Sequence, residues 1–340
     1  MPYIAALDGI RGIAVLMVVV FHAKAPFLVG GFFGVDVFFV LSGFLITSLL
    51  QAELARTGRI DLKRFYARRL LRLTPPLFLT LTLYWLIAPY AWPTYASHTR
   101  DTLLAATYMS DYTRALWNMP DMLRHTWSLA IEEHFYLGWP LVLLTLRQAR
   151  PRTVLIILVG LYVLATVWRI SCASSESWQM VYYRFDTRLS GLMLGAVVSV
   201  LLSVTTQKRY GRYVFVAALY AFTFIAFAGG WRDPAALKFG VIAAEFGAAV
   251  VIVGAMRADK YVHWLAWQPL TYIGRLSYGI YLFHFPIMLY LRSTYGWETA
   301  LALGTFSSCL LAALSHHTME AWVRRWRNKH LIASNTATTP

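Results

Sequence analysis

Arg11 and His22 enclose an unbroken apolar stretch near the start of the chain. They are eleven positions apart, which is about three turns of an α-helix, so both side chains are expected on nearly the same helix face. An imidazole inside a membrane helix is costly unless it faces protein or water. Because a neutral imidazole can remove a proton from a hydroxyl, the pair predicts a catalytic site built around His22, with Arg11 nearer one membrane surface.

Asp36 is the first carboxylate that could assist this imidazole. It lies near the beginning of the second apolar segment, and the short connection 24–31 should leave it at a depth similar to that of His22. A carboxylate within hydrogen-bond reach would orient the ring and raise its basicity. The alternative is that Asp36 caps its helix or pairs with Lys24.

Glu132 and Glu133 form an acidic pair inside a later apolar segment, which is expensive for a helix without a polar role. Adjacent helical positions diverge by about 100°, so one carboxylate should face the protein interior. We expect Glu132 to take part in the chemistry. A structural pairing with Arg124 or Arg188 is the alternative.

A basic cluster precedes the third apolar segment, in the stretch 59–77 (RIDLKRFYARRLLRLTPPL). One interpretation is an amphipathic surface helix that binds anionic lipid headgroups. The other is a guanidinium site for phosphates, since arginine pairs with phosphate oxygens through two hydrogen bonds. Both can hold, and the members of the cluster are Arg64, Arg68, Arg69 and Arg72.

Charged residues also gather in the stretch 182–196, where Arg184, Asp186 and Arg188 stand at the start of an apolar segment. They are expected either to hold a sugar or to form an ion-pair network. Trp127, at the start of the segment that carries the acidic pair, is a further candidate for contact with the acceptor.

Several other polar residues interrupt apolar segments without a role that the sequence assigns. His284, two residues before Pro286, is expected to pack or hydrogen-bond rather than to act as a base. The two cysteines have no metal-ligand or disulfide spacing, and no metal site is expected. The unassigned residues are Glu245, His316 and His317.

The composition is that of a polytopic membrane protein. Hydrophobic residues make up 58% of the 340 residues and charged residues only 14%, and the mean hydropathy is +0.53. A soluble chain of this length would have about a quarter of its residues charged. The net charge of +15 lies at the ends of the apolar segments, so membrane lipids rather than nucleic acid are the expected partners.

An all-α integral membrane fold with about ten transmembrane helices follows from windows of about 20 apolar residues. Twice as many Lys and Arg residues fall on the side of the termini as on the other, which predicts that both termini are cytoplasmic. The stretch 101–117 is too polar to span and is expected as a re-entrant or interfacial helix. Residues 1–330 should form one transmembrane domain, and residues 331–340 a disordered tail. The expected spans are 7–24, 34–51, 74–92, 127–146, 153–169, 187–204, 213–229, 236–255, 273–291 and 299–321.

Six segments in this order resemble the acyltransferase-3 family of integral-membrane O-acyltransferases, which modify bacterial surface sugars. Arg11 and His22 match the essential pair of that family, Arg69 and Arg72 match its cytoplasmic Arg-x-x-Arg, and Glu132 matches its acidic position. The segments are LDGIRGIAVLMVVVFH, GGFFGVDVFFVLSGFLIT, RFYARRLLRLTPP, HTWSLAIEEHFYLGWP, YRFDTRLSGLMLGA and LSYGIYLFHFPI.

The resemblance implies a multi-pass protein of the bacterial inner membrane that takes an acyl group, usually acetyl from acetyl-CoA, from the cytoplasmic side. It also implies a carbohydrate or glycolipid acceptor at the outer face, and a separate periplasmic partner for any second transfer step. The chain departs from the family pattern at His134, where Gln is common, and at Ser190 and Gly191, where Asp-Ala is frequent. These departures affect the expected acceptor contacts rather than the chemistry.

The residues also fit a proton-coupled secondary transporter, because intramembrane His, Asp and Glu residues build proton relays. No inverted repeat or pair of broken helices is visible in the sequence. The acyltransferase interpretation therefore assigns His22 as general base or transient acyl carrier, assisted by Asp36 or Glu132, and Arg11, Arg69 and Arg72 as donor-binding residues.

Overall fold

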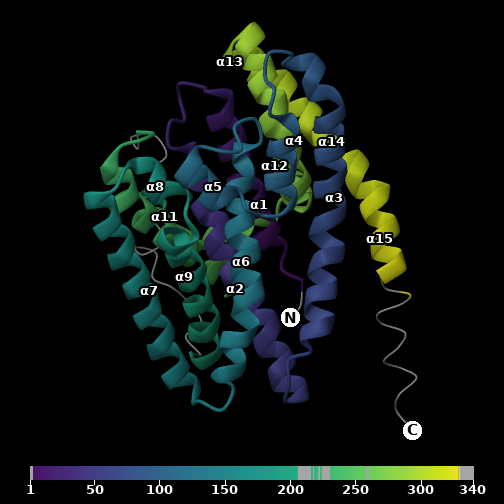
Figure 1. Ribbon diagram of the computed structural model, residues 1–340. Coiled ribbons are helices and arrows are strands. Elements are labelled where there is room, and N and C mark those ends of the chain that lie inside the picture. Colours follow the sequence, from purple (N-terminus) through teal and green to yellow (C-terminus); the bar gives the residue numbers. More distant parts are fainter. Residues whose placement is uncertain are drawn as a thin grey trace.

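The computed structural model describes residues 3–205, 216, 218–220, 223, 230–257, 260–327 and 329, in which helices joined by loops are the regular structure and no strand occurs. The helices run side by side in an elongated bundle (Figure 1). Its main helices are α1 (Ala5–Ala23), α2 (Gly34–Thr57), α3 (Leu62–Ala91), α6 (Trp127–Thr145), α7 (Pro151–Ser175), α9 (Phe185–Val204), α11 (Val241–Met256), α12 (Gln268–Tyr295) and α14 (Thr305–His317).

Shorter helices connect these or cover the ends of the bundle. They are η1 (Gly31–Phe33), α4 (His98–Ala106), α5 (Ser110–Trp117), η2 (Arg124–Thr126), α8 (Trp178–Tyr183), the π-helical turn η3 (Ala236–Gly240), η4 (Lys260–Ala266), α13 (Trp297–Thr299), the π-helical turn η5 (Ala300–Gly304) and α15 (Met319–Arg327).

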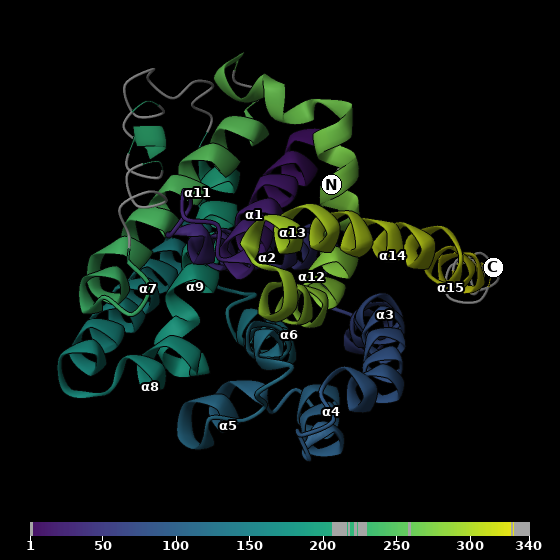
Figure 2. The ribbon, with the colours of Figure 1, turned by 90° about the horizontal axis from the view of Figure 1, so that it is seen from above.

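The centre of the bundle is the pair α1 and α12, which lies between α7 on one side and α3 on the other (Figure 2). A Cβ atom on Gly12 would come within 2.5 Å of the Leu270 carbonyl oxygen, and one on Gly274 would overlap the backbone of Asp8. Small residues therefore bring the two backbones into direct contact, as is usual between membrane helices. This contact fixes α12 against the face of α1 that carries the chemistry.

A second close pair joins α2 to α9. A Cβ atom on Gly43 would meet the Leu192 carbonyl oxygen at 2.0 Å, and one on Gly195 would meet the Val40 carbonyl oxygen at the same distance. The small surface that Gly43 offers is thus used for helix packing. Since α2 also packs on α1, the two glycine-mediated pairs form one core.

Seven of the described helical segments are long and apolar enough to cross a membrane, and they match seven of the ten expected spans. The expected spans 127–146 and 273–291 form α6 and α12, which are less apolar because they carry polar side chains such as Glu132 and His284. The expected span 213–229 lies largely outside the described residues, as does the tail 331–340.

Two expected surface elements take a different form. The basic stretch 59–72 is not a separate helix but the first turns of α3, which is capped by Asp61 and runs for 30 residues. The stretch 101–117 forms two short helices, α4 and α5, rather than one. They lie at the upper end of the bundle in Figure 1.

The segment that contains α4 and α5 is held together by the buried carboxylate of Asp101. Its Oδ2 accepts hydrogen bonds from the Tyr95 hydroxyl at 2.9 Å and from the backbone nitrogens of Asp121 and Met122. Burial, together with the bond to Asp101, raises the pKa of Tyr95 to about 12. The segment is therefore an ordered cover on this end of the bundle.

Candidate active site

Arg11 and His22 both contact α12, so they share one face of α1 as their spacing predicts. Arg11 Nε donates to Ser277 Oγ at 3.2 Å, and the His22 ring lies against His284, with 3.0 Å between His22 Nδ1 and His284 Nε2. Ser277 and His284 are two turns apart on α12. The glycine-mediated contact between the helices thus places each residue of the pair beside a polar partner.

The protonation of the His22 ring follows from its hydrogen-bond chain. His284 Nδ1 lies 2.7 Å from the Tyr281 carbonyl oxygen, which can only accept, so Nδ1 carries the hydrogen. With both rings neutral, His284 Nε2 is then the acceptor and His22 Nδ1 the donor. The lone pair of His22 is therefore on Nε2, as a general base at this position requires.

His22 lines a cavity of about 920 Å³, referred to here as the outer cavity. Its lining includes aromatic side chains from α6, α8 and the segment 230–232, and arginines from η2 and α12. The ring of His125 also lines it: His125 Nε2 lies 3.2 Å from the Leu282 carbonyl oxygen, and His125 Nδ1 has no partner among the described residues. The cavity is wide enough for a sugar unit beside His22.

Arg11 lines a different cavity of about 300 Å³, the inner cavity, together with Arg69, Arg72 and Glu132. The Tyr136 hydroxyl donates a hydrogen bond to Glu132 Oε2 at 2.7 Å. The Arg69 guanidinium lies over the Tyr136 ring, with 4.8 Å between Arg69 Cζ and the ring centroid. The structure therefore gathers the four residues that the sequence assigned to donor binding and to the acidic position. They come from α1, α3 and α6.

The two cavities share a wall that includes Val35 and Tyr281, since both residues line both cavities. The Tyr281 hydroxyl donates to the His125 carbonyl oxygen at 2.7 Å and lies 2.6 Å from Ser128 Oγ. A path from Arg11 to His22 would have to pass this wall.

Neither expected carboxylate is hydrogen-bonded to His22 among the described residues. Asp36 is buried and accepts a hydrogen bond from Arg188 at 2.6 Å, which differs both from the expected contact with His22 and from a pair with Lys24. Glu132 lies in the inner cavity, with Tyr136. Asp36 on α2 is instead paired with the buried Arg188 on α9, since a buried charge needs a partner of opposite charge. The position beside His22 is occupied by His284.

The residues expected to contact the acceptor are divided between two places. Trp127 lines the outer cavity, and its ring also faces the buried Arg188 guanidinium at 5.8 Å. Arg184 and Asp186 are not part of that lining. They pair with each other, and Arg184 also binds Glu176 at 2.6 Å, so the ion-pair interpretation describes them.

The Arg184 network is held by charge. The hydrogen bonds that Arg184 donates to Asp186 raise the pKa of Arg184 above its ordinary value. Glu245, to which the sequence assigns no role, belongs to a second ion-pair network, which is fully buried. Its carboxylate accepts hydrogen bonds from Arg169 and Ser190.

Several residues of the site gave no clear signal in the sequence. His125 and Tyr281 belong to segments that were singled out for other residues, and His284 was expected only to pack or hydrogen-bond. Arg124 and Arg292 stand at the ends of apolar segments, as the topological charges of any membrane protein do. Among the described residues no group of three or more metal-ligating side chains occurs.

The sequence of the chain is similar to a known family and to curated proteins. The sequence pattern of a family described as "acyltransferase domain" matches residues 4–317. The O-acetyltransferase OatA of Staphylococcus aureus (strain NCTC 8325) is 33% identical over 313 residues, which cover 86% of this chain and 52% of the relative. The peptidoglycan O-acetyltransferase OatA of Listeria monocytogenes is 29% identical over 351 residues, covering 95% and 56%.

The chain thus spans about half the length of these curated relatives. No solved structure matches the chain.

Proposed function

The chain belongs to the acyltransferase family whose pattern it matches over residues 4–317, and from this premise we propose that it is a membrane O-acetyltransferase. It moves an acetyl group from cytoplasmic acetyl-CoA to a carbohydrate hydroxyl. Because the Listeria monocytogenes relative is named for peptidoglycan, peptidoglycan is the acceptor we propose. The observation that supports the proposal best is His22, whose unprotonated Nε2 belongs to a ring that lines a sugar-sized cavity.

The inner cavity is the proposed donor site. Arg11, Arg69 and Arg72 present guanidinium groups, which pair well with the phosphates of coenzyme A. A donor held there would extend its thioester arm along α1, past the wall at Val35 and Tyr281, toward His22.

His22 is the proposed base. Its Nε2 removes the proton of the acceptor hydroxyl as the hydroxyl oxygen forms a bond to the thioester carbonyl carbon. The carbon–sulfur bond then breaks, and the imidazolium returns its proton to the leaving thiolate. The competing route uses His22 as a transient acetyl carrier, and both routes need the same lone pair on Nε2.

The lower end of the bundle in Figure 1 is the proposed cytoplasmic side of a bacterial inner membrane. The connections at that end, between α2 and α3 and between α6 and α7, and the helix ends beside them carry six arginines, at positions 56, 59, 64, 147, 150 and 152, and connections with such an excess stay inside. With this orientation, α1 runs outward from Arg11 to His22, so the inner cavity serves the donor and the outer cavity serves the acceptor.

The test is transfer by the purified full chain in proteoliposomes. Acetyl-CoA carrying a labelled acetyl group is supplied with a peptidoglycan-derived disaccharide, and mass spectrometry follows the addition of one acetyl group to the sugar. The expected result is labelled ester that hydroxylamine removes. Substrate uptake into sealed vesicles without any acetylation would overturn the proposal in favour of a transporter.

A further inference from the structure

The described residues that line the outer cavity include five cations and no carboxylate. Arg292 and Arg124 flank the cavity next to His22, and Lys24, Arg114 and Arg232 complete the set. The inner cavity, by contrast, contains Asp8 and Glu132 beside its three arginines. The outer cavity therefore carries an excess of positive charge, whereas carboxylates within the inner cavity balance part of its own positive charge.

The nearest ion pairs leave most of this charge uncompensated. Asp121, which does not line the cavity, lies 3.6 Å from Arg114 and 3.4 Å from Arg124, so two guanidinium groups share one carboxylate. No ion pair joins Arg292 or Arg232 to a carboxylate among the described residues. Converging cations at the mouth of a concave site attract anions over long range.

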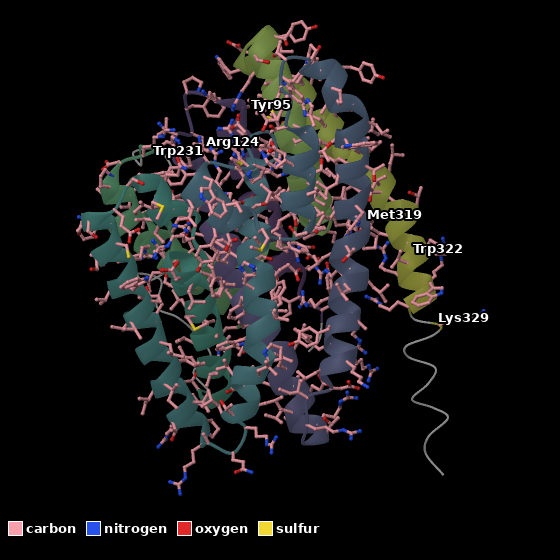
Figure 3. All side chains as sticks on the ribbon, viewed as in Figure 1. Tyr95, Arg124, Trp231, Met319, Trp322 and Lys329 are labelled. Carbon is pink, nitrogen blue, oxygen red and sulfur yellow. The ribbon has the colours of Figure 1, made fainter. Side chains whose placement is uncertain are left out.

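Aromatic rings also line the outer cavity. Trp178 stacks on Tyr182 with 4.3 Å between ring centroids, and Trp231 packs edge-on against both. In Figure 3 Trp231 and Arg124 are both labelled at the upper end of the bundle. Flat aromatic faces suit the apolar face of a pyranose ring, and the neighbouring guanidinium groups suit an acidic substituent on it.

We propose that the outer cavity selects an anionic saccharide, that is, a sugar that carries a carboxylate or phosphate close to the hydroxyl that is modified. This proposal rests on the proposed function, in which the outer cavity receives the acceptor. It names the chemical class of that acceptor.

The anion also has a role in the chemistry at His22. Arg292 donates a hydrogen bond from its terminal nitrogen to the His22 carbonyl oxygen at 2.7 Å, so a fixed positive charge lies beside the base. That charge opposes formation of the imidazolium. An acidic substituent bound to Arg292 offsets it, so an anionic acceptor assists its own deprotonation and a neutral one does not.

The first experiment measures binding without turnover. The full chain in detergent micelles is dialysed to equilibrium against a labelled peptidoglycan disaccharide with a free lactyl carboxylate, against its methyl ester, and against a polyprenyl phosphate. We expect the acid to bind about tenfold more tightly than the ester at low salt, with the difference shrinking as salt is added. Equal binding of acid and ester at low salt overturns the proposal.

The polyprenyl phosphate distinguishes the source of the charge. If the acid is preferred over the ester and the lipid phosphate does not compete, the anion is on the glycan. If the lipid phosphate displaces the acid, the anion site serves the phosphate of a lipid-linked sugar, which is still an anionic saccharide.

Charge-removing variants locate the site. Arg292→Gln and Arg232→Gln are each expected to reduce the preference for acid over ester to about twofold, because a neutral amide keeps a hydrogen-bond donor but loses the charge. The matched control is Arg100→Gln on α4, whose side chain is 45% exposed and lies outside the cavity lining. A preference that persists in both variants, or that the control also removes, contradicts the proposal.

The same acceptor pair separates this inference from the proposed function. Acetyl transfer to both acid and ester at equal kcat/KM keeps the O-acetyltransferase assignment and overturns the charge selection. Selective binding of the acid without acetyl transfer keeps the anion site and overturns the assignment of the reaction.

Discussion

The inner and outer cavities lie along one helix but differ in charge. In the inner cavity, Arg11 is hydrogen-bonded to the Ser277 hydroxyl and Glu132 to the Tyr136 hydroxyl, so both charges have a polar partner. The outer cavity places His22 among arginines and aromatic rings. This difference supports the proposal that the two cavities hold different reagents, with the new bond formed beside His22 rather than beside Arg11.

The largest expected effect comes from removing the base in the outer cavity. His22→Ala should lower acetyl transfer by about 10²–10⁴-fold, because a positioned general base typically contributes that much. The measurement is single-turnover transfer by purified protein, and the control is unchanged retention of acetyl-CoA by the inner cavity. Transfer at the wild-type rate would show that the two cavities do not differ in the proposed way.

The second prediction concerns Asp36, which the sequence placed in the chemistry and the structure pairs with Arg188. Arg188→Met leaves a buried carboxylate without a partner, and breaking such a pair costs about 3–5 kcal/mol. We expect a large loss of folded protein in membranes, measured by thermal unfolding in detergent.

The double variant Asp36→Leu with Arg188→Met is the control, because replacing both charges with apolar groups is often neutral. It should recover both the fold and acetyl transfer. If the double variant folds but transfers no acetyl group, then Asp36 contributes to the chemistry as well as to packing.

The sequence predicted the helical membrane class and the shared face of Arg11 and His22, because both follow from hydropathy and helical periodicity. It could not predict the partner of Asp36. The position of Asp36 in its apolar segment predicts its depth in the membrane. Whether it contacts His22 or Arg188 depends on how α9 packs against α2. That packing is set by Gly43 and Gly195, which the sequence offers among many small residues.

The same limit applies to His284 and to the basic stretch before α3. A single histidine within an apolar segment does not show which residue its ring contacts. The hydrogen bond between His284 and His22 joins residues 262 positions apart, so neighbouring residues do not predict it. The helix α3 continues through Pro75 and Pro76, whereas proline usually marks the start of a helix. The sequence therefore does not reveal that the basic stretch and the third apolar segment form one helix. Arg69 and Arg72 nevertheless line the same cavity as Arg11, and their binding of the donor stays a prediction.

The third prediction tests whether His284 positions His22. His284→Leu removes the acceptor for His22 Nδ1 and should lower transfer about 10–100-fold, by analogy with residues that orient metal-binding histidines through a hydrogen bond. His284→Gln places an amide oxygen where it can accept the same hydrogen bond, and it should restore most of the activity. Equal losses in the two variants would mean that His284 only fills space.

The smallest expected effect belongs to the inner cavity and is confined to the donor. Arg69→Ala should raise the apparent KM for acetyl-CoA about tenfold with little change in kcat, because a hydrogen bond to a charged group contributes about 1.5–3 kcal/mol. Its neighbour Arg68 is exposed and does not line the cavity, so Arg68→Ala is the matched control. An unchanged KM in the Arg69 variant would mean that the basic residues at the start of α3 bind lipid headgroups rather than the donor. A fall in kcat instead would mean that Arg69 acts on the thioester, and the separation of donor binding from chemistry along α1 would no longer hold.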